Sequence, residues 1–176
     1  MPFDSLPSHV FPADAFADLM AANEEYARDF QDQHLSGRAA KGLAVVTCMD
    51  SRLNPLAILG MKPGDVKLLR NAGARVTEDV LRTLVLASWL LGVKRVLVMA
   101  HTDCRMASGS EQDIHKSIFL ESGVDTRGIE IRTVEDQEAA LKLDVQRIRS
   151  FPLLPELQVG GVIYDVHTGR LTSVDC

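Results

Sequence analysis

Residues 43–52 read LAVVTCMDSR, an apolar run followed at once by a cysteine, an aspartate and an arginine. The run Leu43–Thr47 is rich in β-branched side chains, which is typical of a buried strand in a parallel sheet. Cys48, Asp50 and Arg52 follow where this strand passes into a loop. Functional loops in parallel α/β sheets lie at the carboxyl ends of the strands. This stretch therefore predicts both an α/β fold and the place of a functional site.

The next strands of the chain end in the same way. Val66–Leu69 predicts a strand that ends at Arg70-Asn71-Ala72-Gly73, and Thr77 then caps a buried helix. Arg95–Ala100 predicts a third strand, which ends at His101-Thr102-Asp103-Cys104. Strands separated by helices form right-handed parallel units. We therefore expect the loops after all three strands to meet at one edge of the sheet.

The C-terminal part of the chain predicts two more helices and a pair of strands. Ser110–Leu120 is helical in pattern, and Thr133-Val134-Glu135-Asp136 resembles a capping box that opens a second helix. Val159–Val166 predicts a strand, and Leu171–Val174 predicts a return strand. The expected fold class is α/β, a three-layer domain whose mainly parallel central sheet, with one or more antiparallel edge strands, is flanked by helices.

The length of 176 residues suits one domain. We predict a single domain over residues 1–176, with an N-terminal arm and helix over about residues 1–36. Prolines at positions 2, 7 and 12 make residues 1–12 an irregular arm, after which Asp14 is placed to cap a helix. Apolar side chains recur along this helix at helical spacing: Phe16, Leu19, Met20, Tyr26 and Phe30. This stripe is expected to cover either a partner subunit or the chain's own sheet.

Composition excludes several classes of protein. Apolar residues make up 46% and charged residues 24%, as in soluble globular proteins, and the net charge of −5 argues against binding to nucleic acid or anionic membranes. No apolar run approaches the roughly 20 residues that a membrane span requires, and residues 1–12 lack the pattern of a secretory signal. Three cysteines are an odd number and too few for a disulfide scaffold, which predicts a cytoplasmic location.

Cys48, His101 and Cys104 form a candidate metal site if their strand ends lie side by side. Zinc prefers thiolate and imidazole ligands in a tetrahedral shell, and a catalytic site keeps one position for water. Free cysteines are also common as small core residues, but two of them with a histidine at two strand ends favour the metal interpretation. The other histidines lack such neighbours and are predicted to be surface or structural residues: His9, His34, His115 and His167.

Asp50 and Arg52 are two residues apart in the loop after Cys48. Such residues ordinarily form a surface ion pair. Beside a metal, the carboxylate either binds the ion or accepts a hydrogen bond from metal-bound water, and Arg52 can hold it away from the ion in a bidentate grip. The pair therefore has two alternative arrangements, which suggests a switch.

Taken in order, Cys48-x-Asp50-x-Arg52, Arg70-Asn71-Ala72-Gly73 and His101-Thr102-x-Cys104 resemble the motifs of the β-class carbonic anhydrases. The resemblance extends from about Leu43 to Met106 and continues more weakly into the C-terminal strand, and it points to the small bacterial subgroup. It implies an α/β fold, a homodimer or homotetramer, and one Zn²⁺ per subunit held by Cys48, His101 and Cys104. It also implies that Asp50 and Arg52 are the catalytic dyad, with Asp50 a fourth zinc ligand in some members.

One residue departs from the family pattern. Members usually have glycine after the residue that matches Cys104, whereas this chain has Arg105. If that position requires a positive φ, an arginine there is strained.

The expected activity is that of a carbonate dehydratase, a lyase that interconverts carbon dioxide with bicarbonate and a proton. Zinc lowers the pKa of bound water from ~15.7 towards ~7, so that a zinc-bound hydroxide attacks carbon dioxide while Asp50 orients it and Arg52 keeps Asp50 ionised. The same motifs leave two alternatives open. One is hydrolysis of carbon disulfide or carbonyl sulfide on the same scaffold, and the other is a catalytically silent zinc-binding oligomeric module.

Overall fold

The computed structural model describes residues 11–176, so His9 and most of the predicted arm over residues 1–12 lie outside the described residues. The chain divides into two compact units, one up to Leu35 and the other Ser36–Cys176, which we call the core unit. Among residues 11–176, no helix combines the length and the apolar character needed to cross a membrane.

The first unit contains the predicted N-terminal helix. A short 3-10 helix, η1 (Ala13–Phe16), leads into α1 (Ala17–Arg28), and η2 (Asp32–His34) follows. Asp14 does not cap α1, because it lies inside η1, and Phe16 takes the capping position without a side-chain hydrogen bond. Within the described chain, α1 contains no buried residue. The surface that its apolar stripe covers therefore stays a prediction.

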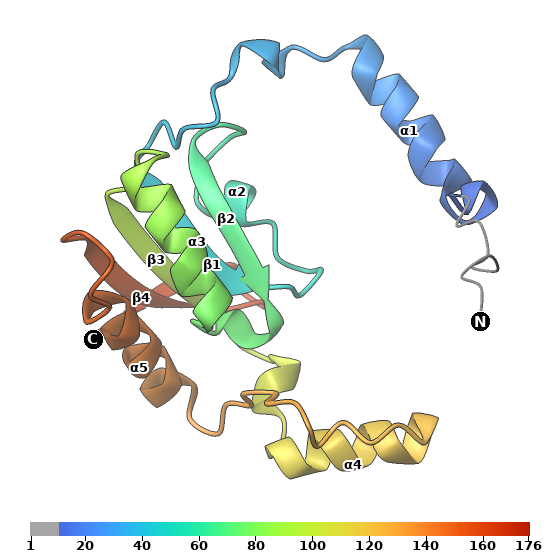
Figure 1. The fold of residues 1–176 in the computed structure, drawn as a ribbon, viewed down its shortest axis with the longest axis vertical. Helices are drawn as coiled ribbons and strands as arrows, with labels where there is room; N and C mark the ends of the chain where they lie inside the picture. The colour runs from blue at the N-terminus through green and yellow to red at the C-terminus, as the bar shows by residue number, and fades with distance from the viewer. Residues whose placement is uncertain (1–10) are drawn as a thin grey trace, which may run out of the picture. The chain divides into compact units, whose positions relative to one another are not determined.

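The core unit is built on a five-stranded sheet with the strand order β2-β1-β3-β4-β5 (Figure 1). The first four strands in the chain pair in parallel, and β5 runs antiparallel to β4 at one edge. The predicted α/β class, with a mainly parallel sheet and an antiparallel edge strand, is therefore confirmed. The strands are β1 (Leu43–Cys48), β2 (Val66–Asn71), β3 (Arg95–His101), β4 (Gln158–Tyr164) and β5 (Leu171–Val174).

Helices pack on both faces of this sheet. Side chains alternate between the two faces along a strand, so Val46 and Val98 face one way and Val45 and Met99 face the other. On the first face lie α3 (Glu78–Trp89) and α5 (Gln137–Arg149) (Figure 1). Their apolar side chains are buried against the strands. On the second face, the short α2 (Pro55–Ile58) contributes Ile58. The remaining helix is α4 (Glu111–Ser122).

The helix starts confirm one predicted cap and contradict another. Thr77 caps α3 as predicted, since its side chain accepts a hydrogen bond from the Val80 amide. The capping box predicted at Thr133 is wrong, because α5 begins at Gln137 and Asp136 is its cap. The reason is tertiary: the Val134 amide donates to the Met106 carbonyl at 2.8 Å, and Val134 is buried. That pairing holds the segment in a non-helical form until Asp136.

The register of the central strands brings the predicted loops together. In the β1–β3 pair Thr47 lies opposite Met99, and in the β1–β2 pair Cys48 lies opposite Asn71. Because all three strands run in the same direction, Cys48, Asn71 and His101 end at the same edge of the sheet.

Candidate metal centre

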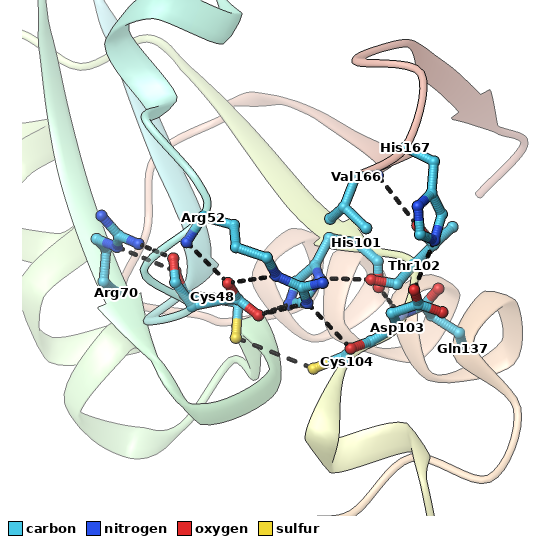
Figure 2. Close-up of polar contacts among 11 residues, drawn as sticks. Cys48, Arg52, Arg70, His101, Thr102, Asp103, Cys104, Gln137, Val166 and His167 are labelled. Carbon is cyan, nitrogen blue, oxygen red and sulfur yellow. Dashed lines mark hydrogen bonds and ion pairs between the residues drawn. The ribbon is translucent and has the colours of Figure 1, made fainter.

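Three ligand-type side chains meet at this edge of the sheet (Figure 2). Cys48 is the last residue of β1, His101 is the last residue of β3, and Cys104 directly precedes the 3-10 turn η4 (Arg105–Ala107). All three are buried, with exposed fractions of 4%, 1% and 7%. Their ligand atoms lie within 4.8 Å of one another.

The spacing of the two sulfur atoms is that of a shared metal ion. Cys48 Sγ and Cys104 Sγ are 3.9 Å apart. Two thiolates on one tetrahedral zinc, each at about 2.3 Å from the metal, are about 3.8 Å apart. A disulfide would require about 2.05 Å. The pair is therefore arranged for joint coordination and not for a disulfide.

His101 presents its other ring nitrogen to this cluster. Its Nδ1 lies 2.8 Å from the Thr102 carbonyl oxygen, which can only accept, so Nδ1 carries the proton and Nε2 has the lone pair. Nε2 is buried and has no hydrogen-bond partner among residues 11–176. A buried acceptor without a partner is costly, and a metal ion would satisfy it. A carbonyl partner on Nδ1 is the usual support of a metal-binding histidine.

The electrostatics of the thiols also favour a cation. Burial, followed by the nearby Cys48, raises the pKa of Cys104 to about 11. With no cation present, the thiol of Cys104 is therefore neutral at physiological pH. A divalent ion reverses this preference, because coordinated thiols lose their protons. The buried Cys/His/Cys cluster thus fits a metal ion that prefers sulfur and nitrogen ligands.

The Asp50 carboxylate lies beside the cluster in the grip of Arg52. Arg52 Nε donates to Asp50 Oδ1 at 3.0 Å and Nη2 donates to Oδ2 at 2.7 Å, while the Arg52 amide also donates to Oδ1 at 2.9 Å. These hydrogen bonds hold the pKa of Asp50 well below its ordinary value. Oδ2 is also 3.9 Å from His101 Nε2. Both oxygens are thus held by Arg52, and the ionised carboxylate faces the imidazole.

Two further contacts fix the loop that carries this pair. Arg70, at the end of β2, donates from Nε to the Cys48 carbonyl at 3.0 Å and from Nη2 to the Asp50 carbonyl at 2.7 Å (Figure 2). Arg52 Nη2 makes a second hydrogen bond, to the Asp103 carbonyl at 3.1 Å. Arg52 therefore connects the loop after β1 to the loop after β3.

Arg105 does not carry the strain considered for it. It belongs to the turn η4, and its side chain is exposed near Ser108 Oγ, 3.4 Å from Nη1. The residue of this loop with a positive φ is Asp103, at 54°. Aspartate tolerates the left-handed region better than most residues, so the loop closes without a glycine after Cys104.

An open depression leads to the cluster, and Asp50, Arg52, Cys104, Arg105 and Gln137 are among the residues that line it. Gln137, at the start of α5, donates from Nε2 to the His101 carbonyl at 2.6 Å. Sequence reasoning gave no role to Gln137, because a contact across 36 residues leaves no local pattern. Arg70 was part of the quoted Arg70-Asn71-Ala72-Gly73 motif, but its hydrogen bonds to the Cys48 and Asp50 carbonyls were not predicted.

Comparison with known proteins places the chain in a family. Its residues 43–171 match the family model described as carbonic anhydrase. It is 33% identical over 158 residues to β-carbonic anhydrase 1 of Mycobacterium tuberculosis, covering 89% of this chain and 96% of the relative. The crystal structure of carbonic anhydrase from Streptococcus mutans is 34% identical and superposes with a TM-score of 0.85, covering 94% of this chain and 99% of that one.

A relative with a different name is also similar. A carbon disulfide hydrolase of Acidianus sp. is 32% identical over 155 residues, covering 73% of this chain and 75% of the relative.

The chain belongs to the β-class carbonic anhydrase family. The predicted resemblance is thereby confirmed, and the buried Cys/His/Cys cluster lies where its motifs placed it.

Proposed function

We propose that this protein is a zinc-dependent carbonic anhydrase, which hydrates carbon dioxide reversibly to bicarbonate and a proton. The observation that carries the proposal is the Asp50–Arg52 pair beside the three-residue cluster, with Asp50 Oδ2 at 3.9 Å from His101 Nε2. A purely structural metal site has no need of an ionised carboxylate clamped at its edge. This pair therefore argues against a catalytically silent zinc-binding module.

The position of the pair matters more than its geometry. Asp125 and Arg127 form the same local arrangement elsewhere on the chain, with Nε to Oδ1 at 2.9 Å and Nη2 to Oδ2 at 2.6 Å. That pair lies away from any cluster of metal ligands found among the described residues. An Asp-x-Arg clamp forms readily by itself, so its place beside Cys48 and His101 is what indicates chemistry.

The roles follow from the contacts. Cys48, His101 and Cys104 would hold the ion, and a bound zinc supplies a water of lowered pKa and hence a nucleophile at neutral pH. Asp50, whose carboxylate lies beside the three ligand-type residues, would accept a hydrogen bond from that nucleophile and so orient it towards carbon dioxide. Arg52 keeps Asp50 ionised and aimed, because it donates to both carboxylate oxygens. Asp50 becomes a fourth ligand only if it leaves this grip.

Carbon disulfide hydrolysis is the second candidate, supported by the similarity to the Acidianus enzyme. The same site residues would serve either substrate. The mycobacterial and streptococcal carbonic anhydrases are matched over 96% and 99% of their lengths, against 75% for the Acidianus hydrolase and 84% for the carbon disulfide hydrolase of Acidithiobacillus thiooxidans. Shared length therefore favours carbon dioxide over carbon disulfide or carbonyl sulfide.

We also propose a cytoplasmic homodimer or homotetramer, in line with the family. Support for association comes from α1, whose large apolar side chains are exposed: Leu19, Met20 and Tyr26. Exposed apolar surface of this kind typically marks a protein contact.

The test is stopped-flow hydration of carbon dioxide by zinc-loaded protein across pH, with metal-stripped protein as a blank. We expect turnover that rises with pH and depends on zinc. Asp50→Ala should keep one zinc per subunit and lose about 100-fold in kcat, as is typical when a group that aids proton handling is removed. Asp125→Ala is the matched control and should behave as wild type.

Three outcomes would count against the proposal. Absence of carbon dioxide turnover with full zinc, together with hydrolysis of carbon disulfide, would favour the second candidate. Inactivity towards both substrates would favour a silent module. Unchanged turnover in Asp50→Ala would remove the carboxylate from the reaction.

A further inference from the structure

His167 lies in the turn between β4 and β5, far along the sequence from the metal-ligand motifs. Sequence reasoning predicted it to be a surface or structural residue, and its side chain is indeed 71% exposed. Its Nε2, however, lies 2.6 Å from Asp103 Oδ2, and Asp103 is the residue just before Cys104 (Figure 2). His167 therefore reaches the loop that carries two of the three ligand-type residues.

The backbone around His167 is firmly placed. Asp165 Oδ1 accepts hydrogen bonds from the amides of His167, at 2.8 Å, and Thr168, at 3.1 Å. Two hydrogen bonds join this region to the metal loop: the Val166 amide donates to Thr102 Oγ1 at 3.1 Å, and the Thr102 amide donates to the carbonyl of Tyr164, the last residue of β4, at 2.9 Å. The imidazole is thus presented to Asp103 from a fixed support.

Asp103 connects this support to the catalytic pair. Its side chain contacts His167, while its carbonyl oxygen accepts a hydrogen bond from Arg52 Nη2 at 3.1 Å. The same Nη2 donates to Asp50 Oδ2 at 2.7 Å. A continuous path of three contacts therefore runs from His167 through Asp103 and Arg52 to Asp50.

Asp103 also has a conformation that needs support. Its φ of 54° lies in the left-handed region, and it sits between two ligand-type residues, His101 and Cys104. Its carboxylate and its carbonyl oxygen are engaged at the same time, by His167 and by Arg52. Exposed ion pairs contribute little to global stability, and the side chains of His167 and Asp103 are 71% and 56% exposed.

We propose, on the basis of the proposed function, that His167 is a positioning residue for the Asp50–Arg52 pair and acts through Asp103. Nε2–H of His167 donates to the Asp103 carboxylate and keeps the Asp103 carbonyl turned towards Arg52. Arg52 then has both of its Nη2 hydrogens engaged and holds Asp50 in one orientation.

The first measurement does not depend on turnover. In zinc-loaded protein labelled with ¹⁵N-arginine, the Arg52 Nε–H resonance is identified by its loss in Arg52→Lys, and its hydrogen exchange is followed. His167→Ala should speed this exchange about fivefold, the effect of weakening one hydrogen-bonded restraint. His167→Gln, which keeps a donor at the end of the side chain, should restore most of the protection.

Arg170→Ala is the matched control in the same turn, because the Arg170 side chain makes no hydrogen bond or ion pair within residues 11–176. It should leave Arg52 exchange at the wild-type rate. Unchanged exchange in His167→Ala, or equal acceleration in Arg170→Ala, would overturn the proposal.

The second measurement is carbon dioxide hydration by the same variants. His167→Ala should lower kcat about fivefold and leave KM unchanged, since positioning acts on the transition state, and His167→Gln should recover the rate. Recovery of His167→Ala by added imidazole buffer would instead show proton transfer by His167 and would overturn the positioning role. If wild-type protein hydrates no carbon dioxide, the proposed function fails, while the Arg52 exchange measurement still decides the role of His167.

Discussion

Gly73 in the loop after β2 gives the sharpest test of how this edge of the sheet is packed. Its φ is +77°, and a Cβ added there would lie 3.1 Å from Met106 Cβ and 3.2 Å from Met106 Cγ. Met106 is 8% exposed and belongs to the turn directly after Cys104. In Gly73→Ala, the added methyl group should therefore push on the segment that places a candidate metal ligand.

Two terms set the size of the effect. A left-handed conformation costs a non-glycine residue about 1–2 kcal/mol. Overpacking a filled site costs typically about 1–3 kcal/mol more. The free energy of unfolding of Gly73→Ala should therefore fall by about 2–5 kcal/mol, and its zinc affinity should fall by about tenfold because Cys104 moves with Met106.

Gly60→Ala separates the two terms. Its φ is +63°, and nothing lies within 4 Å of an added Cβ, so this variant bears only the backbone cost of about 1–2 kcal/mol. Urea unfolding of metal-free protein measures both variants without a contribution from zinc binding, and metal analysis then gives zinc per subunit. Equal losses of stability in the two variants, with equal zinc affinity, would refute the packing argument for Gly73.

Two further predictions concern the surroundings of the site. Arg75 Nε lies 2.7 Å from the buried Asp144 carboxylate. Arg75→Met leaves this carboxylate without a partner and should lower the free energy of unfolding by about 3 kcal/mol. A loss below about 1 kcal/mol in urea unfolding would contradict this. Hydrogen bonds from the Ile131 and Arg132 amides hold the pKa of Glu111 below its ordinary value. These hydrogen bonds should be present at neutral pH and lost as pH falls through the lowered pKa of Glu111. The NMR chemical shift of the Ile131 amide should therefore titrate with a midpoint below about pH 4.3 in wild type, and it should not titrate in Glu111→Gln. A midpoint at or above that value would contradict the prediction.

Much of the fold was predictable because it depends on local patterns. The β-branched run before Cys48 and the Thr77 cap are signals contained within a few residues, and both elements formed as expected. The meeting of Cys48, His101 and Cys104 followed from one topological rule, that parallel strands end at a common edge. The β1–β3 register then sets how the ends of these two strands, Cys48 and His101, lie relative to each other.

The features that escaped prediction depend on distant partners. Asp136 caps α5 because the Val134 amide is hydrogen-bonded to the Met106 carbonyl. This long-range contact is not visible in the local capping pattern. His167 and Gln137 reach the metal loop from the end of the chain and from α5. The sequence predicted strain at Arg105 if that position required a positive φ, but the residue of this loop with a positive φ is Asp103.

The position of the ligand-type residues in the sheet bears on whether the chain needs its metal ion in order to fold. Cys48 and His101 stand at the ends of two adjacent central strands, and the larger buried cluster, formed with α3 and α5, lies on the opposite face of those strands from Val45 and Met99. The larger cluster contains none of the three ligand-type residues, so its packing does not depend on an ion. We therefore expect the metal-free protein to stay folded and to bind zinc again without having to refold.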